Sequence, residues 1–115
     1  LGDWIASIEH LRATLSDDLL VLPAHGEPFR GLHARLDRLA HGHERGLQRL
    51  RRSLAESPRR TVDVFGALFA RAIDNTGELL GMATGEGVAH LNHLLVRGEA
   101  VRETGADGVY RYRMK

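Results

Sequence analysis

The N-terminal half of the chain carries apolar residues at helical spacing over two stretches. In residues 3–15 the apolar side chains recur every three or four positions, which is the period of one face of an amphipathic helix. Those side chains are Trp4, Ile8, Leu11 and Leu15. We predict that this helix has Asp3 as its N-cap and ends at residues 16–18.

The second stretch, residues 30–56, is the longest periodic segment of the sequence. Its apolar face consists of leucines and one histidine: Leu32, Leu36, Leu39, His43, Leu47, Leu50 and Leu54. Gly42 and Gly46 fall in its middle, where glycine costs roughly 1 kcal/mol against alanine, so we predict a bend there or two consecutive helices. Before this stretch, the apolar run 19–22 ends at Pro23 and has the pattern of a short buried strand.

The C-terminal half predicts two further helices. We expect Thr61 to cap a helix that continues through Ile73 and is followed by a turn at residues 74–77. A second helical stretch starts near Glu78, is interrupted at its internal glycines, and resumes to Arg97.

Beyond Gly98, which has the position of a helix-ending glycine, the period changes to two. Residues 100–103 and 109–114 alternate as the strands of a β-hairpin do, and residues 105–108 join them. Residues 43–115 therefore have the order helix, helix, helix, hairpin, which is typical of a winged helix-turn-helix. The predicted fold is mostly α (α+β) with a C-terminal β-hairpin. This topology predicts a fold and no function.

Composition limits the classes of protein that fit. With 43% hydrophobic and 27% charged residues, the chain can build a packed core. It contains no cysteine, which excludes disulfides and thiolate metal ligands and favours a reducing, cytoplasmic compartment. No apolar run approaches the roughly 18 residues of a membrane span, and no signal-peptide pattern opens the chain. The first residue is Leu1 rather than methionine, which suggests a fragment or a processed chain.

Charge is distributed unevenly, although the net charge is only +1. Residues 30–60 hold nine arginines against three acidic residues, whereas residues 1–29 hold one arginine against five. Such a basic segment indicates either a surface that binds an anionic partner or the solvent-exposed polar face of an amphipathic helix. The candidate contacts to nucleic acid or substrate are Arg45, Arg49, Arg52, Arg111 and Arg113. A continuous positive face would favour nucleic acid, and a scattered pattern would favour packing against another domain.

Four segments stand out together: LVLPAHGEPF, LAHGHERGLQRL, TVDVFGALF and GVAHLNHLLVRGEAVRE. In this order they resemble the C-terminal end of metallo-β-lactamase-fold hydrolases that carry an appended winged-helix domain. The most specific piece is the histidine–glycine turn after an apolar run, followed at this distance by the helices. The resemblance implies that residues 1–29 are a helix and short strand of the hydrolase domain, residues 30–42 a linker helix, and residues 43–115 the winged-helix domain.

The resemblance also implies one site residue. His25 matches the last metal ligand of the family's active site, which holds two metals, usually zinc. A neutral imidazole is a good ligand for Zn²⁺, and Gly26 lets the backbone approach the site closely. The other ligands of the family, including its H-x-H-x-D-H motif, are absent from this sequence. Because catalytic zinc usually needs three protein ligands, we expect this chain alone to be inactive and to bind no metal at His25.

For the intact protein, the resemblance implies a metal-dependent hydrolase of a thioester, lactone, phosphodiester or similar bond. Its winged helix would wall the substrate cleft, bind substrate or mediate association. The expected partners are the missing N-terminal hydrolase domain, a second copy that packs through residues 1–40, or single-stranded RNA. The alternative function is a non-catalytic winged-helix module that binds RNA or DNA.

The remaining histidines indicate no further site. Three lie on the long predicted helix without the spacing of a shared site: His33, His41 and His43. His90 and His93 share a face with Glu86 on the last helix, and we expect exposed polar positions there rather than metal ligands. The outward residues of that helix offer little positive charge, which disfavours binding of duplex DNA. Tyr110 and Tyr112 are expected on the core-facing side of the hairpin rather than as stacking platforms for bases.

Overall fold

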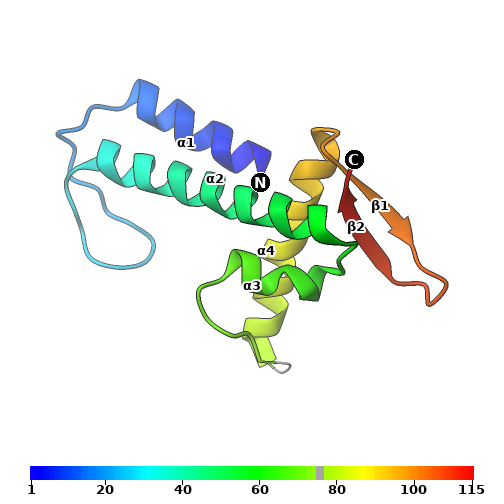
Figure 1. The fold of residues 1–115 in the computed structure, drawn as a ribbon. Coiled ribbons are helices and arrows are strands. Elements are labelled where there is room, and N and C mark those ends of the chain that lie inside the picture. The colour runs from blue at the N-terminus through cyan, green and yellow to red at the C-terminus, as the bar shows by residue number, and fades with distance from the viewer. Residues whose placement is uncertain (75–76) are drawn as a thin grey trace. The chain divides into compact units, whose positions relative to one another are not determined.

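The structure, a computed structural model, describes residues 1–74 and 77–115 (Figure 1). The chain order is α1 (Gly2–Thr14), α2 (Leu32–Glu56), the 3-10 helix η1 (Thr61–Val64), α3 (Phe65–Leu68), α4 (Gly77–Val96), β1 (Ala100–Thr104) and β2 (Tyr110–Met114). The predicted class, mostly helical with a two-stranded antiparallel hairpin, is confirmed. The chain divides into two compact units, Leu1–Glu44 and Arg45–Lys115. In the described ranges, no helix combines the length and apolar character needed to cross a bilayer.

Unit 1 is built from α1, the first part of α2 and the loop between them (Figure 1). Ile8 of α1 is buried together with Leu32 and Leu36 of α2. Val21 from the loop and Ala40 from α2 pack against this cluster. The core of unit 1 therefore joins all three of its segments.

The apolar face predicted for α1 is only partly buried within unit 1. Ile8 is 3% exposed, whereas Trp4, Leu11 and Leu15 retain 53%, 39% and 40% exposure. Trp4 is held by a polar contact instead, because its indole Nε1–H donates a hydrogen bond to His43 Nε2 at 2.9 Å. Most of the apolar face of α1 therefore remains on the surface of this unit.

Two local predictions for this unit are wrong. Asp3 is not the N-cap of α1 but lies in its first turn, where its carboxylate interacts favourably with the helix dipole. Residues 19–22 do not form a strand, because only Val21 is bridged to another segment, at Phe29. Pro23 has no N–H to donate to a longer ladder, so the pairing stops after one bridge.

α2 is a single continuous helix, so the prediction of two consecutive helices is wrong. Three leucines after the glycines are at most 2% exposed: Leu47, Leu50 and Leu54. Full burial of each leucine stabilises by about 1.5–3 kcal/mol, so the three together exceed the roughly 1 kcal/mol that each of Gly42 and Gly46 costs in the helix. Gly46 is itself buried, and a Cβ at this position would be in van der Waals contact with Leu68 and His90.

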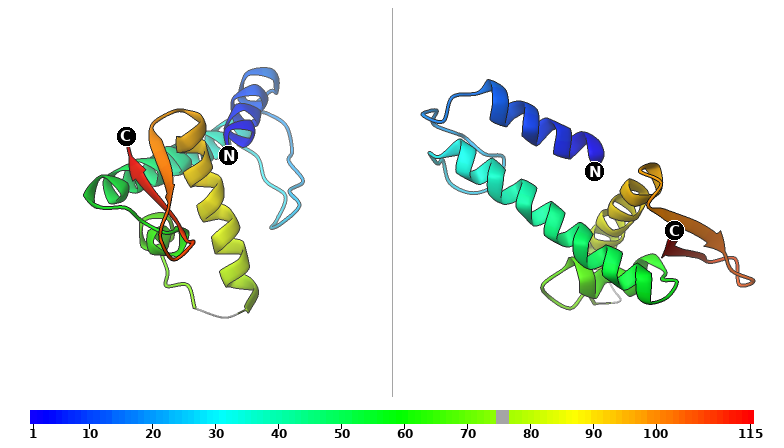
Figure 2. Two further views of the ribbon diagram at one scale, coloured as in Figure 1. Left: turned by 90° about the vertical axis from the view of Figure 1, so that its right-hand side faces the viewer. Right: turned by 45° about the horizontal axis from the view of Figure 1, so that its top comes forward.

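Unit 2 packs the second part of α2, η1, α3 and α4 around one core and sets the hairpin beside α4 (Figure 2). Its fully buried side chains are Leu47, Leu50, Leu54, Val64, Leu91 and Leu94. Gly87 permits the close approach of η1 to α4, because a Cβ at this position would lie 3.0 Å from Thr61 Cγ2 and 3.5 Å from Phe65 Cε1.

The helix predicted over residues 61–73 is shorter than expected and begins as a 3-10 turn. α3 ends at Leu68, and Phe69 is extended with φ −113° and ψ 141°. The Phe69 ring packs on Phe65 with 5.7 Å between centroids, so the two rings remain in contact where the helix ends. The turn expected at residues 74–77 includes residues 75 and 76, which lie outside the described residues.

The cap of η1 is Arg60 rather than the predicted Thr61. The Asp63 carboxylate accepts a hydrogen bond of 2.9 Å from the Arg60 backbone N–H and pairs with the Arg60 guanidinium at 2.7 Å. The side-chain hydrogen bond from Arg60 lowers the pKa of Asp63 below its ordinary value. An ion pair therefore takes the place of the hydroxyl cap.

α4 runs without interruption from Gly77 to Val96, so the breaks predicted at its glycines are wrong. Buried positions line its inner face from the first half to the last turn: Ala83, Gly87, His90, Leu91 and Leu94. Tertiary packing along the whole helix overrides the weak helix propensity of glycine.

The end of α4 follows the prediction for Gly98, which has a φ of +70°. The Gly98 N–H donates to the Leu95 carbonyl, and the Glu99 N–H donates to the Leu94 carbonyl, both at 2.9 Å. These two bonds satisfy carbonyls of the last turn and form a Schellman motif. The chain then reverses directly into β1.

The hairpin pairs Arg102 with Tyr112 and Glu103 with Arg111. Arg59, in the segment between α2 and η1, adds an isolated antiparallel bridge to Tyr112. Tyr112 is buried, whereas Tyr110 is 49% exposed. Both tyrosines lie on one face of the hairpin, which we call the tyrosine face. On this face Tyr112 packs into the core and Tyr110 lies at the surface.

Glu99 connects three parts of unit 2. Its carboxylate accepts hydrogen bonds from Arg51 Nε at 2.7 Å and from Arg97 Nε at 2.6 Å. Its backbone carbonyl accepts a bond from the Lys115 N–H at 3.0 Å. The hydrogen bonds from Arg51 and then Arg97 lower the pKa of Glu99 from 4.5 to about 2. α2, the end of α4 and the end of the hairpin thus meet at one residue.

The substitution Glu99→Gln is expected to lower the free energy of unfolding by about 1–2 kcal/mol at pH 7, because charge-assisted hydrogen bonds are lost. The folded-state pKa lies below the unfolded-state value, so this stabilisation is present above pH 4.5 and is lost as the pH falls toward about 2. Urea unfolding of both proteins at a series of pH values would show the difference shrinking in acid.

The matched control is Glu103→Gln, which removes a more exposed ion pair with Arg113. Exposed pairs contribute little, so the control should cost about 0.5 kcal/mol or less. Equal losses for the two variants, or a difference for Glu99→Gln that does not change with pH, would contradict the assignment.

Candidate functional site

His25 lies at the tip of a loop that is closed at its base. Val21 and Phe29 exchange two backbone hydrogen bonds, of 2.8 and 3.0 Å, and His25 stands midway between them. Gly26 has a φ of +88°, a conformation that glycine adopts without strain and that turns the chain directly after the histidine. His25 is exposed, so its imidazole is accessible from outside unit 1.

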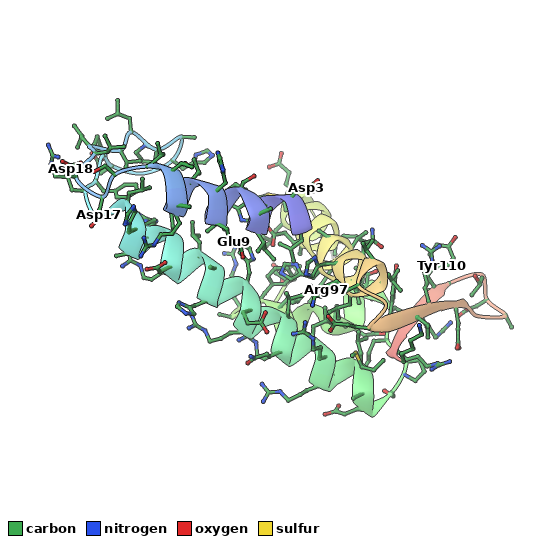
Figure 3. All side chains as sticks on the ribbon, turned by 90° about the horizontal axis from the view of Figure 1, so that it is seen from above. Asp3, Glu9, Asp17, Asp18, Arg97 and Tyr110 are labelled. Atoms are coloured by element: carbon green, nitrogen blue, oxygen red, sulfur yellow. The ribbon has the colours of Figure 1, made fainter. Side chains whose placement is uncertain are left out.

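Polar contacts anchor both ends of this loop. Arg30 Nη1 donates to the Asp18 carbonyl at 2.7 Å, and the Asp17 carboxylate accepts from the His33 backbone N–H at 2.8 Å. The second bond satisfies a free N–H in the first turn of α2 and places an acidic group at the positive end of its dipole. Figure 3 shows Asp17 and Asp18 in this loop, next to the start of α2. The loop is therefore braced on the helix that follows it.

His33 is a structural residue of unit 1. Its Nδ1 lies 2.9 Å from Arg12 Nη1, and its Nε2 lies 2.7 Å from the Leu15 carbonyl. Arginine can only donate and a carbonyl can only accept, so Nδ1 is the acceptor and Nε2 carries the proton. Arg12 also pairs with Asp37 at 3.0 Å. Both ring nitrogens of His33 are thus engaged, which leaves neither free for a metal.

The residues of this chain do not complete a metal site around His25. Within residues 1–74 and 77–115, no group of three or more His, Asp or Glu side chains is placed to hold a metal ion. Catalytic zinc usually takes three protein ligands and a water. The loop therefore presents one exposed imidazole as a possible metal ligand, and the described residues do not complete a metal site around it.

His90 and His93 are not exposed polar positions, so that prediction is wrong. His90 is 6% exposed, and its Nδ1 lies 2.8 Å from the Glu86 carbonyl. Burial lowers the pKa of the partly buried His93. His90 lies one helical turn from Gly87 and from Leu94, so the buried stripe of α4 could have identified it from the sequence.

The five candidate arginines are mostly engaged within unit 2. Arg111 pairs with Asp107 at 2.7 Å, and Arg113 pairs with Glu103 at 2.8 Å. Hydrogen bonds from Arg111 hold the pKa of Asp107 well below its ordinary range. Arg49 Nε donates to a backbone carbonyl in α3 at 2.7 Å. The other two candidates, Arg45 and Arg52, are exposed on α2.

We expect the chain to bind single-stranded RNA weakly, because two of the five arginines already have carboxylate partners and one donates to the backbone. Fluorescence anisotropy with a labelled RNA at roughly 50 and 150 mM salt tests this, since phosphate contacts give strong salt dependence. Tight binding at low salt that weakens when Arg45 and Arg52 are both changed to glutamine would contradict the expectation.

Comparison with known proteins places the chain in a family. Residues 47–115 match the family model described as "Metallo-beta-lactamase-like, C-terminal domain". The crystal structure of a beta-lactamase domain protein from Burkholderia ambifaria is similar, with a TM-score of 0.89 and 38% identity, over 97% of this chain and 32% of that chain. A metallo-beta-lactamase family protein from Thermus thermophilus has a TM-score of 0.78 and 24% identity, over 100% of this chain and 33% of that chain. A search of the curated proteins finds no match.

The chain therefore belongs to the metallo-β-lactamase-like family, in the part that the family model describes as its C-terminal domain. The family found by resemblance in the sequence is confirmed. The appended winged-helix domain stays a prediction. The similarity to the Thermus protein, at 24% identity, establishes a common fold alone. The chain spans about a third of the length of these structures, 32% and 33%.

Proposed function

We propose that this chain is the C-terminal part of a metal-dependent hydrolase of the metallo-β-lactamase superfamily. The observation that supports the proposal is His25, exposed at the tip of a braced loop in a chain of this family. The family usually uses zinc. His25 would be one ligand of a two-zinc centre, and the other ligands would come from the rest of the hydrolase domain, outside this chain. Zinc bound there would supply an activated hydroxide for hydrolysis of a thioester, lactone, phosphodiester or similar bond.

The role of this chain is then to hold one ligand in a fixed direction. The Val21–Phe29 bridge closes the loop, and the contacts of Asp17 and Arg30 anchor its ends. A ligand held in place before the metal arrives loses less conformational freedom on binding. The arrangement of unit 1 thus favours affinity for the metal without contributing further donors.

Unit 2 is proposed to be a winged-helix domain whose hairpin is the wing. The order of α2, α3, α4 and hairpin supports this, and the bridge from Arg59 to Tyr112 adds a short third segment to the hairpin. In the intact hydrolase this domain would shape the substrate cleft or mediate association.

In a protein that joins this chain to the rest of the hydrolase domain, His25→Ala is expected to lower bound zinc and hydrolytic rate by roughly 100-fold or more, since a direct ligand is removed. Elemental analysis and hydrolysis of a thioester and a phosphodiester would measure the two effects. His41→Ala, at another exposed histidine, should change neither. Full zinc content and activity in the His25 variant would refute the assignment.

We also propose that in the isolated chain the exposed residues of α1 pair two copies through residues 1–40. Trp4, Leu11 and Leu15 form the apolar surface that would be covered. Light scattering should then give twice the monomer mass, and Leu15→Glu should give the monomer. Val96→Glu, at an exposed apolar residue of unit 2, is the control and should leave the dimer intact. A wild-type chain that stays monomeric at high concentration would exclude this pairing.

A further inference from the structure

A cavity of about 500 Å³ lies in unit 2 where η1, α4 and the hairpin converge. This volume falls within the roughly 300–1,000 Å³ of pockets that bind small molecules. Its walls include three valines, Val62, Val88 and Val109, and the side chains of Tyr110 and Tyr112. Its polar lining includes Arg60, Asn92 and Arg102.

The topology explains why residues so far apart in sequence meet here. Arg102 stands opposite Tyr112 in the hairpin register and therefore lies on the tyrosine face. The bridge from Arg59 to Tyr112 brings the start of η1 to the other edge of β2. Val88 and Asn92 are one helical turn apart on α4, which runs beside the hairpin (Figure 2). Figure 3 locates Tyr110 on the hairpin.

The pocket carries one uncompensated positive charge. Both carboxylate oxygens of Asp63 bond the Arg60 guanidinium, at 2.7 and 3.0 Å, which neutralises it. The Arg102 guanidinium lies over the Tyr110 ring, 4.2 Å from its centroid. In the part of the chain that the structure describes, no carboxylate forms an ion pair with Arg102. Its charge is positioned by an aromatic ring and remains available to an anion.

We propose that this pocket binds a small organic monoanion with a flat apolar body, of the class of an aromatic carboxylate. Arg102 bonds the carboxylate, Asn92 donates from its side-chain amide, and the apolar body packs against the valines and tyrosines. A pocket with one available cation and apolar walls suits a small ligand with one negative group. A nucleic acid strand would instead need several cations along its backbone. The site does not involve His25 or the proposed metal centre.

The experiment is an NMR titration of the ¹⁵N-labelled 115-residue chain with 2-naphthoate. The side-chain amide of Asn92 and the backbone amides of Thr61 and Val88 should shift together and saturate. Arg102→Gln should weaken binding about tenfold, the loss of one charge-assisted contact. The control variant Arg113→Gln also removes one positive charge, but from the opposite face of the hairpin. It should leave the affinity for 2-naphthoate unchanged. The neutral analogue 2-naphthamide should bind the wild-type chain about tenfold more weakly.

A second variant keeps the test decisive if Arg102→Gln fails to fold. Val88→Phe fills the cavity from α4 and should abolish the shifts, with an otherwise unchanged spectrum. The proposal is overturned if the Asn92 amide does not shift at millimolar naphthoate, if naphthamide binds equally well, or if Val88→Phe binds like the wild type. A second cavity of unit 2, of about 430 Å³, is lined by Leu68, Phe69 and Met82 among others. Shifts confined to that cavity would also overturn the proposal.

Discussion

The leucine stripe of α2 is the constraint on which both units depend. Leu32 and Leu36 belong to the core of unit 1, and Leu47, Leu50 and Leu54 belong to the core of unit 2. Each buried leucine stabilises by about 1.5–3 kcal/mol, so the stripe keeps a helix continuous that its glycines alone would weaken. The loop that carries His25 and the chain segment that bridges to the hairpin both start from the ends of this one helix.

Several arginines of the basic segment, residues 30–60, form ion pairs inside unit 2. Arg51 bonds Glu99, Arg59 pairs with Glu56, and Arg60 pairs with Asp63. The first pair links α2 to the residue before β1, and the other two link the segment between α2 and η1 to the helices on either side of it. Net charge along a sequence is therefore a poor guide to a polyanion-binding surface when acidic partners lie nearby in the fold. Arg102 instead lies over an aromatic ring, as Arg35 does over Phe29.

Periodicity predicted the long elements well, namely α1, α2 and the hairpin, because their patterns repeat over several turns or pairs. It failed at the end of α3, where Phe69 is extended although the apolar pattern continues to Ile73. It also overestimated the helix-breaking effect of the glycines in α4. Packing along the whole helix stabilises α4 more than these glycines destabilise it. For the site, no pattern in the chain distinguishes a lone histidine, so the role proposed for His25 rests on the family resemblance alone. The pocket joins residues from four segments, and only the hairpin register and the Arg59 bridge bring them together.

The hydrogen bond between Trp4 and His43 has a consequence for observing this molecule. Trp4 is the only tryptophan of the chain, and it belongs to unit 1, whereas both tyrosines belong to unit 2. Tryptophan emission therefore reports on the attachment of α1 to α2, and tyrosine absorbance reports on the hairpin and its core. Each unit carries its own spectroscopic label, so the order in which they lose structure is visible without any added dye.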